Sequence, residues 1–292
     1  MVDYIFGNYL VECGKLSKLE LQQVLQTQDS VRVKLGLIAV AEDLMTQEQA
    51  EEINRLQAVL DKRFGDIAVD KGYLTQVQVS ELLKKQGDTW LTFVQAMVDA
   101  GYVSAEEMAW LLDDFRRENG YTDAQIEDFK SDEVDRIIPL LLPKDAQKYK
   151  DIICTVVRTM VRLIDRHVYA SHGALVEEMP VEDMVSQCLT GENGFMDCLA
   201  ERDGALLNTC AIFGQEEFPR LNMDAIDAAG ELLNCMNGLY ASARSREGHF
   251  LELMPPEYRL NAYGQPQVVK EVCRIPIFIG NKGLYFAVGE LV

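Results

Sequence analysis

The chain has 292 residues, of which 48% are hydrophobic, and its 28 Lys and Arg against 47 Asp and Glu give a formal net charge of −19. This length suits two domains with buried cores, and the acidic balance argues against nucleic-acid binding, which normally requires a basic surface. Because the sequence has no run of about 18 apolar residues, no basic leader and no C-x-x-C pair among its seven cysteines, we expect a cytoplasmic protein with neither membrane insertion nor a metal site.

The first half of the chain is an internal repeat with a period of 29 residues. Each of three units opens with an apolar residue followed by Gly and carries a Gln near its end: Phe6-Gly7, Leu35-Gly36 and Phe64-Gly65, with Gln28, Gln57 and Gln86. A hydroxyl residue with Glu or Gln three positions later also recurs, at Ser17, Thr46, Thr75 and Ser104. This pair is typical of a capping box at a helix start. We therefore expect each unit to contain a short helix, a tight turn and a longer capped helix, with 90–117 as a capping repeat.

This half resembles the MshEN-type domains found at the N-terminus of type II secretion and type IV pilus ATPases. The third unit matches best, with Arg63-Phe64-Gly65, Gly72-Tyr73-Leu74 and Gln86 at the positions of the family motif. Tandem motifs of this kind bind cyclic di-GMP in some members. The resemblance implies ligand-binding roles for five residues: Arg63, Gly65, Gln86, Lys34 and Gly36. A helical docking module that binds no nucleotide is the alternative.

An acidic, weakly periodic segment follows from Asn119 to Asp135, where Thr122 or Asp123 is expected to cap one more helix. Pro139 and Pro143 then interrupt helical periodicity. We therefore expect a helical repeat domain at 1–143, a linker near 119–147 and a second domain at 148–292.

The second half alternates helix and strand patterns, which predicts an α+β domain of antiparallel sheet with long helices on one face. Helices are expected at 151–169, 214–220 and 224–242. Strands are expected at 183–191, 194–200, 204–213, 249–254, 268–277 and 284–291. Turns at 192–194 and 281–283 would join two pairs of these strands as hairpins.

The helix expected at 224–242 carries three polar residues at helical spacing. Glu231 and Asn234 are three apart, and Asp227 is four before Glu231, so all three fall on one face. Two polar groups able to reach one substrate atom would therefore project from an otherwise apolar helix. The same pattern also arises on solvated helix faces that have no function.

The region from about 148 to 292 resembles the CheC/CheX/FliY phosphatases of bacterial chemotaxis, and CheX most closely. Their signature is Asp or Ser, Glu four residues later, Asn three after that, and a Pro about two dozen residues downstream; here these are Asp227, Glu231, Asn234, and Pro255 or Pro256. CheC-type members carry a second copy, whose Glu and Asn positions hold Thr155 and Arg158 in this chain. The resemblance therefore implies one site per chain and a CheX-like homodimer.

The resemblance also implies a reaction, the hydrolysis of the phospho-aspartate of a CheY-type response regulator. The regulator would hold the Mg²⁺, so this chain would bind no cofactor of its own. Asn234 would position the attacking water, because an uncharged amide can accept from water and donate to the phosphoryl group. Glu231 would pair with the regulator's active-site lysine, and Asp227 would be a supporting or helix-start residue.

In this interpretation the N-terminal repeats are a sensing or docking module. Two other hypotheses stay open. One is a non-catalytic adaptor that keeps the CheX-like fold, and the other is a cyclic di-GMP-responsive signalling protein.

Overall fold

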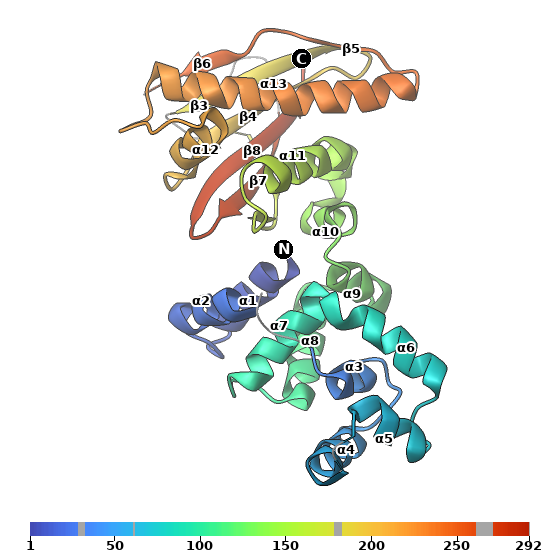
Figure 1. The fold of residues 1–292 in the computed structure, drawn as a ribbon. Helices are drawn as coiled ribbons and strands as arrows, with labels where there is room; N and C mark the ends of the chain where they lie inside the picture. Colours follow the sequence, from blue (N-terminus) through green and yellow to red (C-terminus); the bar gives the residue numbers. More distant parts are fainter. Residues whose placement is uncertain (29–32, 61, 178–182, 261–270, 292) are drawn as a thin grey trace. The chain divides into compact units, whose positions relative to one another are not determined.

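The computed structural model describes residues 1–292 except 29–32, 61, 178–182, 261–270 and 292 (Figure 1). The chain divides into two compact units, Val2–Asp132 and Glu133–Val292, the latter including Met1. The α+β class expected from the sequence is confirmed: the described part of the first unit is helical, and the second unit combines helices with an antiparallel sheet.

The first unit contains the predicted repeat of short helix, turn and capped helix. Its elements are α1 (Val2–Glu12), α2 (Lys18–Thr27), α3 (Leu35–Ala41), α4 (Gln47–Leu60), α5 (Phe64–Asp70), α6 (Gln76–Lys84), η2 (Lys85–Gly87), α7 (Thr89–Asp99), α8 (Ala105–Glu118) and α9 (Asp123–Lys130). The turns inside the four pairs place one residue in the left-handed region: Gly14, Asp43, Gly72 and Gly101. Asp43 replaces the Gly of the other units and keeps the same backbone conformation, with φ 53°, because Asp tolerates this region better than most residues do.

The predicted capping residues begin the longer helices. Ser17 and Thr75 form complete capping boxes with the residue three positions later. The Thr46 hydroxyl oxygen accepts from the Gln49 N–H at 3.3 Å, and Gln49 Oε1 accepts from the Thr46 N–H at 2.8 Å. Thr122, and not Asp123, caps α9. These local bonds satisfy backbone donors that a helix start leaves unpaired.

The repeated Gly is explained by close helix packing. A side chain at Gly7, Gly36 or Gly65 would meet the residue 14 positions later on the paired helix: Leu21, Ala50 or Val79. At Gly36 it would also lie 2.9 Å from the Phe64 ring. Only Gly lets these helices approach so closely.

The second unit begins at Glu133, ahead of the start expected at 148 and of the boundary expected at about 140–148. Its helices are α10 (Val134–Leu141), η3 (Lys144–Tyr149), α11 (Lys150–Leu163), α12 (Ala205–Gly214) and α13 (Met223–Arg246). Pro139 lies inside α10, so the expectation that it breaks the helix was wrong. Its missing N–H removes one bond close to the helix end, while Ile137, Ile138 and Leu141 stay buried and α10 packs on α11.

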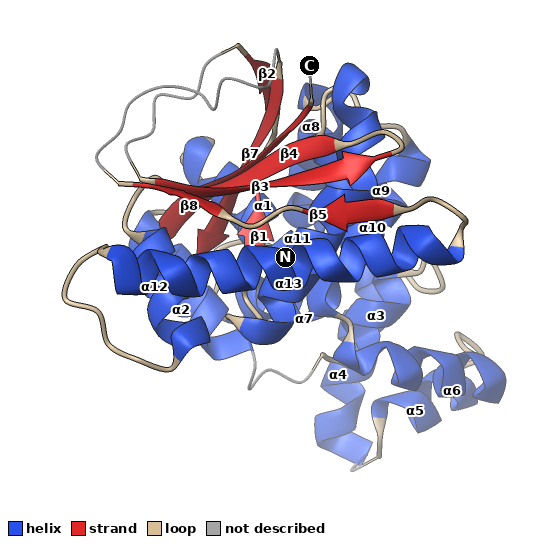
Figure 2. Ribbon diagram, turned by 90° about the horizontal axis from the view of Figure 1, so that it is seen from above, coloured by secondary structure: helices blue, strands red, loops and turns tan. Residues whose placement is uncertain are grey.

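The sheet is antiparallel throughout, with strand order β1-β7-β8-β4-β3-β5, while β2 pairs with β7 and β6 with β3. The strands are β1 (Tyr169–Ala170), β2 (Ala174–Val176), β3 (Met184–Gly191), β4 (Phe195–Glu201), β5 (Leu251–Leu253), β6 (Glu257–Arg259), β7 (Val272–Ile279) and β8 (Lys282–Glu290). Helix α13 packs on β3, β5 and β6, and α12 packs on β4 and β8. Figure 2 shows α11, α12 and α13 on the same side of this sheet.

Several predicted elements of this half need correction. The strand expected at 204–213 is helix α12, whose buried residues Ala205, Leu206, Thr209 and Cys210 follow a helical period. No helix forms at 215–220. The helix expected at 151–169 ends at Leu163, and Tyr169 already belongs to β1.

The hairpins at the end of the chain are close to expectation. The β3–β4 turn lies at 192–194 as predicted. In the last hairpin Ile279 pairs with Lys282, so the turn residues are Gly280 and Asn281 and not 281–283. Of the strand expected at 268–277, residues 268–270 lie outside the described part of the chain, and β7 starts at Val272.

Candidate functional site

Helix α13 presents the polar residues predicted from the sequence. Asp227 and Glu231 are exposed and Asn234 is half-buried, whereas Leu232 and Leu233 between them are fully buried. The helix begins at Met223, one residue before the expected start at 224, and the Asn222 side chain caps it by accepting from the Ala225 N–H at 2.9 Å. Asp227 is therefore not a helix-start residue.

Asp227 contacts the sheet edge through Tyr258 of β6. The Tyr258 hydroxyl donates to Asp227 Oδ1 at 3.0 Å. Burial raises the pKa of this hydroxyl, and the hydrogen bond to Asp227 and the charges of Asp227 and Glu231 raise it further. The ring lies over Gly230, where a methyl group would come within 2.6 Å of Tyr258. Gly230 thus lets Tyr258 cross the helix directly beside Glu231.

The amide of Asn234 is held by Gln187 of β3, a residue that the sequence did not single out. Gln187 Nε2 donates to Asn234 Oδ1 and to the Met254 carbonyl oxygen, each at 2.8 Å. The Asn234 amide nitrogen makes no hydrogen bond with the part of the chain that the structure describes. The Asn234 NH₂ group is therefore an available donor, and the bond from Gln187 to Asn234 Oδ1 fixes its orientation.

Two further buried polar residues continue this network into the core. Asn237 Nδ2 donates to Gln187 Oε1 and to Asp197 Oδ1 of β4, each at 2.9 Å. Gln187, Asp197 and Asn237 are each no more than 1% exposed. Burial raises the pKa of Asp197 to about 8, although the hydrogen bond from Asn237 acts in the opposite direction.

A β-bulge places the Met254 carbonyl beside Gln187. Leu253 pairs with Leu189 and Glu257 pairs with Ser186, so three residues, 254–256, oppose two on β3. Pro255 restricts Met254 to an extended conformation, and the Met254 N–H donates to the Cys188 carbonyl at 2.9 Å. The downstream prolines of the signature thus shape the segment that anchors Gln187.

The positions of a second signature copy are occupied by other contacts. On α11 the Thr155 hydroxyl donates to the Asp151 carbonyl at 2.8 Å, and Arg158 forms an ion pair with Asp135 of α10. The Arg158 guanidinium also donates to the Thr155 hydroxyl, at 3.3 Å. Helix α11 therefore carries structural contacts where a second site would need Glu and Asn.

The five residues of the first unit that were expected to bind a ligand have different structural environments. Gly36 and Gly65 are buried at the helix crossings described above. The Lys34 ammonium pairs with Asp99 at 2.6 Å, and Gln86 Nε2 donates to the Val33 carbonyl at 2.9 Å. Arg63 is exposed at the start of α5. The packing of the two glycines accounts for them without a ligand.

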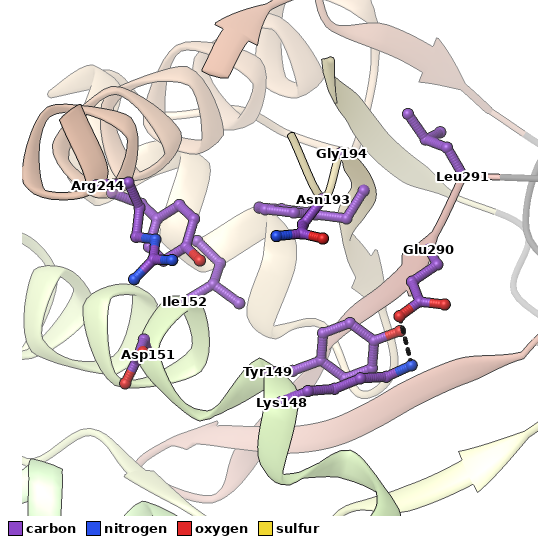
Figure 3. A pocket seen from close by; sticks show the side chains of 11 residues that line it. Lys148, Tyr149, Asp151, Ile152, Asn193, Gly194, Arg244, Glu290 and Leu291 are labelled. Atoms are coloured by element: carbon purple, nitrogen blue, oxygen red, sulfur yellow. Dashed lines mark hydrogen bonds and ion pairs between the residues drawn. The ribbon is translucent and has the colours of Figure 1, made fainter. Parts of the chain in front are cut away.

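A separate cavity of about 530 Å³ lies at the other end of α13, between Tyr240, Arg244 and the start of α11 (Figure 3). Its cations are paired, Lys148 with Glu290 at 2.6 Å and Arg244 with Glu247 at 2.5 Å. It contains neither Glu231 nor Asn234, so it is distinct from the candidate site.

Within the described ranges no cluster of His, Cys, Asp and Glu could hold a metal ion. None of the described helices is both long and apolar enough to cross a membrane.

The helical spacing on α13 pointed to Glu231 and Asn234. Asn237, which follows them in Asn237-Gly238, was noted beside the signature but given no role, and sequence reasoning missed Gln187, Asp197 and Tyr258. One signal was available. Gln187 and Asp197 are polar residues in the middle of largely apolar strands, and a buried polar side chain needs a partner.

No protein-family model matches the chain, and no curated protein matches it. Solved structures resemble about half of this chain, and several of them are chemotaxis proteins. The CheX protein of Desulfovibrio desulfuricans is 11% identical, covering 49% of this chain and 97% of its own, with a TM-score of 0.41. The CheX–CheY–BeF3–Mg²⁺ complex of Borrelia burgdorferi gives 9% identity, 49% and 97% coverage, and a TM-score of 0.41. FliY of Thermotoga maritima gives 16% identity, 50% and 90% coverage, and a TM-score of 0.38.

Proposed function

We propose that the second unit hydrolyses the aspartyl phosphate of a CheY-type response regulator and so terminates a two-component signal. The observation that carries this proposal is the Asn234 amide. Its oxygen is held by Gln187 and its nitrogen lacks a partner in the described structure, one turn from the exposed Glu231.

The chemistry needs little more than placement. Hydrolysis of an acyl phosphate proceeds by in-line attack of water, and catalysis of phosphoryl transfer depends on positioning and electrostatics. The Asn234 NH₂ group can donate to the incoming water oxygen or to a phosphoryl oxygen, and its Oδ1 keeps a second lone pair. Because the amide is uncharged, it does not repel the phosphoryl group.

Glu231 has the opposite requirement. A carboxylate facing a phosphoryl group would repel it, whereas a carboxylate facing a lysine ammonium forms a charge-assisted bond. We therefore assign Glu231 to docking, as the partner of the regulator's active-site lysine. Asp227 is already bonded to Tyr258, so its role is to fix the adjoining sheet edge.

The remaining parts of the proposal concern assembly. The partner is of the CheY type, as in the Borrelia burgdorferi complex of CheX with CheY, and that regulator would bring its own Mg²⁺. The protein would act as a CheX-like homodimer with one site per chain, and the helical repeats would serve as its docking or sensing module.

The test is phosphate release from a CheY-type receiver domain kept phosphorylated with phosphoramidate, for each such regulator of the source genome. Wild-type protein should accelerate dephosphorylation of at least one. Asn234→Ala should lower kcat about 100-fold with little change in KM, because loss of orientation acts on the chemical step. Glu231→Ala should mainly raise KM.

Matched controls are Glu217→Ala, which removes another exposed carboxylate, and Ser242→Ala, which alters the same helix two turns later. Neither should change kcat or KM. Wild-type protein that accelerates no regulator but binds one would favour the non-catalytic adaptor. Full activity in Asn234→Ala would overturn the assigned mechanism.

A further inference from the structure

The directions of the hydrogen bonds beneath Asn234 follow from one atom. A backbone carbonyl can only accept, so the Gln187 atom that faces the Met254 carbonyl is its amide nitrogen. The same nitrogen contacts Asn234, which must therefore present its oxygen. Gln187 Oε1 is then the acceptor toward Asn237, which must present nitrogen. The whole chain of amides has a single polarity.

This polarity leaves two oxygens without donors. Asn237 uses both amide hydrogens, one toward Gln187 and one toward Asp197 Oδ1. Asn237 Oδ1 and Asp197 Oδ2 are buried and have no hydrogen-bond partner in the described structure. Leaving a buried acceptor unpaired is costly, and leaving a buried carboxylate charged is more so. One proton on Asp197 Oδ2 would provide a donor and remove the charge.

The surroundings of Asp197 favour that proton. It lies opposite Gln187 of β3 and Val288 of β8, under Asn237 of α13. The titratable neighbours that interact with it are the thiols of Cys188 and Cys198, whose pKa values are themselves raised by burial and by Asp197. No cation of the described residues offsets its charge.

Building on the proposed function, we infer that Asp197 is a neutral carboxylic acid paired with Asn237, and that through Gln187 this pair positions Asn234 with its NH₂ group directed out of the core. Gln187 is thus a positioning residue. The carboxyl donates to Asn237 Oδ1 and accepts from Asn237 Nδ2, in the manner of a carboxylic acid–amide dimer. Neither Asp197 nor Asn237 touches the substrate.

A double-mutant cycle tests the positioning role. Gln187→Met keeps the shape and removes both donors. It should lower kcat about tenfold or more with little change in KM, since a displacement of about 1 Å can cost about 100-fold. It should have the same effect in the Glu231→Ala background and no further effect in Asn234→Ala. An equal loss in all three backgrounds would mean general damage and would overturn the inference.

Two readouts do not depend on activity. In ¹⁵N relaxation the order parameter of the Asn234 side-chain amide should fall in Gln187→Met, while Thr190→Val on the same strand should leave it unchanged. At neutral pH the infrared spectrum should show a protonated carboxyl band that Asp197→Asn removes. An unchanged order parameter would refute the positioning role, and absence of the band would refute the acid–amide pair.

The two proposals can therefore fail separately. A protein inactive on every regulator, but with the carboxyl band and an ordered Asn234 amide, would retain this network without the proposed function. Asp197→Ala should lower kcat, and Asp197→Asn should restore most of it, because an amide can supply the same donor and acceptor as the neutral acid. Equal losses in both variants would contradict the pairing.

Discussion

The Tyr258 ring occupies the space that a side chain at position 230 would need, so that a methyl group on Gly230 would lie 2.6 Å from the Tyr258 hydroxyl. This contact joins the helix that carries Glu231 to strand β6 at the sheet edge. Because the ring is also tethered to Asp227, it cannot move aside without losing that bond.

Gly230→Ala should therefore destabilise the second unit, by about 1–3 kcal/mol, as overpacking in a tight contact does. Gly238 is the matched control, since it lies in the same helix and nothing is within 4 Å of an added methyl group. There Ala should stabilise by about 0.5–1 kcal/mol because it suits a helix interior better than Gly. Hydrogen exchange of the β3, β4 and β8 amides measures both, and similar values for the two variants would contradict the contact.

The stability of the second unit should depend on pH through Asp197. Its pKa is about 8 in the folded protein and about 3.9 in an unfolded chain. Between these values the folded state holds a proton that the unfolded state has lost, so stability falls as pH rises, by up to about 1.4 kcal/mol per pH unit. Above pH 8 the loss should level off.

Asp197→Asn should remove this slope, because an amide does not titrate. Denaturant unfolding followed by the methyl NMR signals of Leu199 and Val288 reports on this unit alone. A wild-type curve parallel to that of Asp197→Asn between about pH 4 and pH 8 would show that Asp197 is ionised in the fold.

Gly36→Ala should destabilise the first unit by about 1–3 kcal/mol, because the added methyl group meets the buried Phe64 ring. Gly87→Ala is the control, with open space around the new methyl group. Both tryptophans, Trp90 and Trp110, lie in this unit, so tryptophan fluorescence during denaturation isolates its unfolding. Equal midpoints for the two variants would argue against the crossing.

Thr75→Ala should cost about 1 kcal/mol, because it removes the side-chain acceptor for the Gln78 N–H. Thr27→Ala is a suitable comparison, since the Thr27 hydroxyl donates to the Gln23 and Val24 carbonyls of its own helix and caps no helix start. The same fluorescence measurement applies. A loss at Thr27 as large as at Thr75 would show that the cap itself matters little.

Features governed by local interactions could be predicted from the sequence. Ser17 and Thr75 predict helix starts because a cap involves residues only three apart. The spacing of Glu231 and Asn234 likewise places them on a common face of any helix. The glycine of each repeat was visible, but its packing on Leu21 or Ala50 depends on how two helices cross.

Features governed by tertiary contacts could not be predicted from the sequence. The apolar run at 204–213 suits a strand as well as a helix, and α12 forms because it can bury one side against β4, β8 and α13. Gln187 and Asn237 are 50 residues apart in sequence, and no spacing rule connects them. Their network exists only once β3, β4 and α13 have come together.

The bulge at 254–256 has a consequence for how other chains can approach this molecule. Among the described strands, β5 and β6 form the edge of the sheet beside α13, and unpaired edges tend to recruit foreign strands. Pro255 and Pro256 have no N–H to offer, so the edge cannot be extended continuously by another strand at this point. A protein that binds on this side therefore cannot pair its backbone continuously with the sheet edge, and the surface it can contact is formed by the side chains of α13.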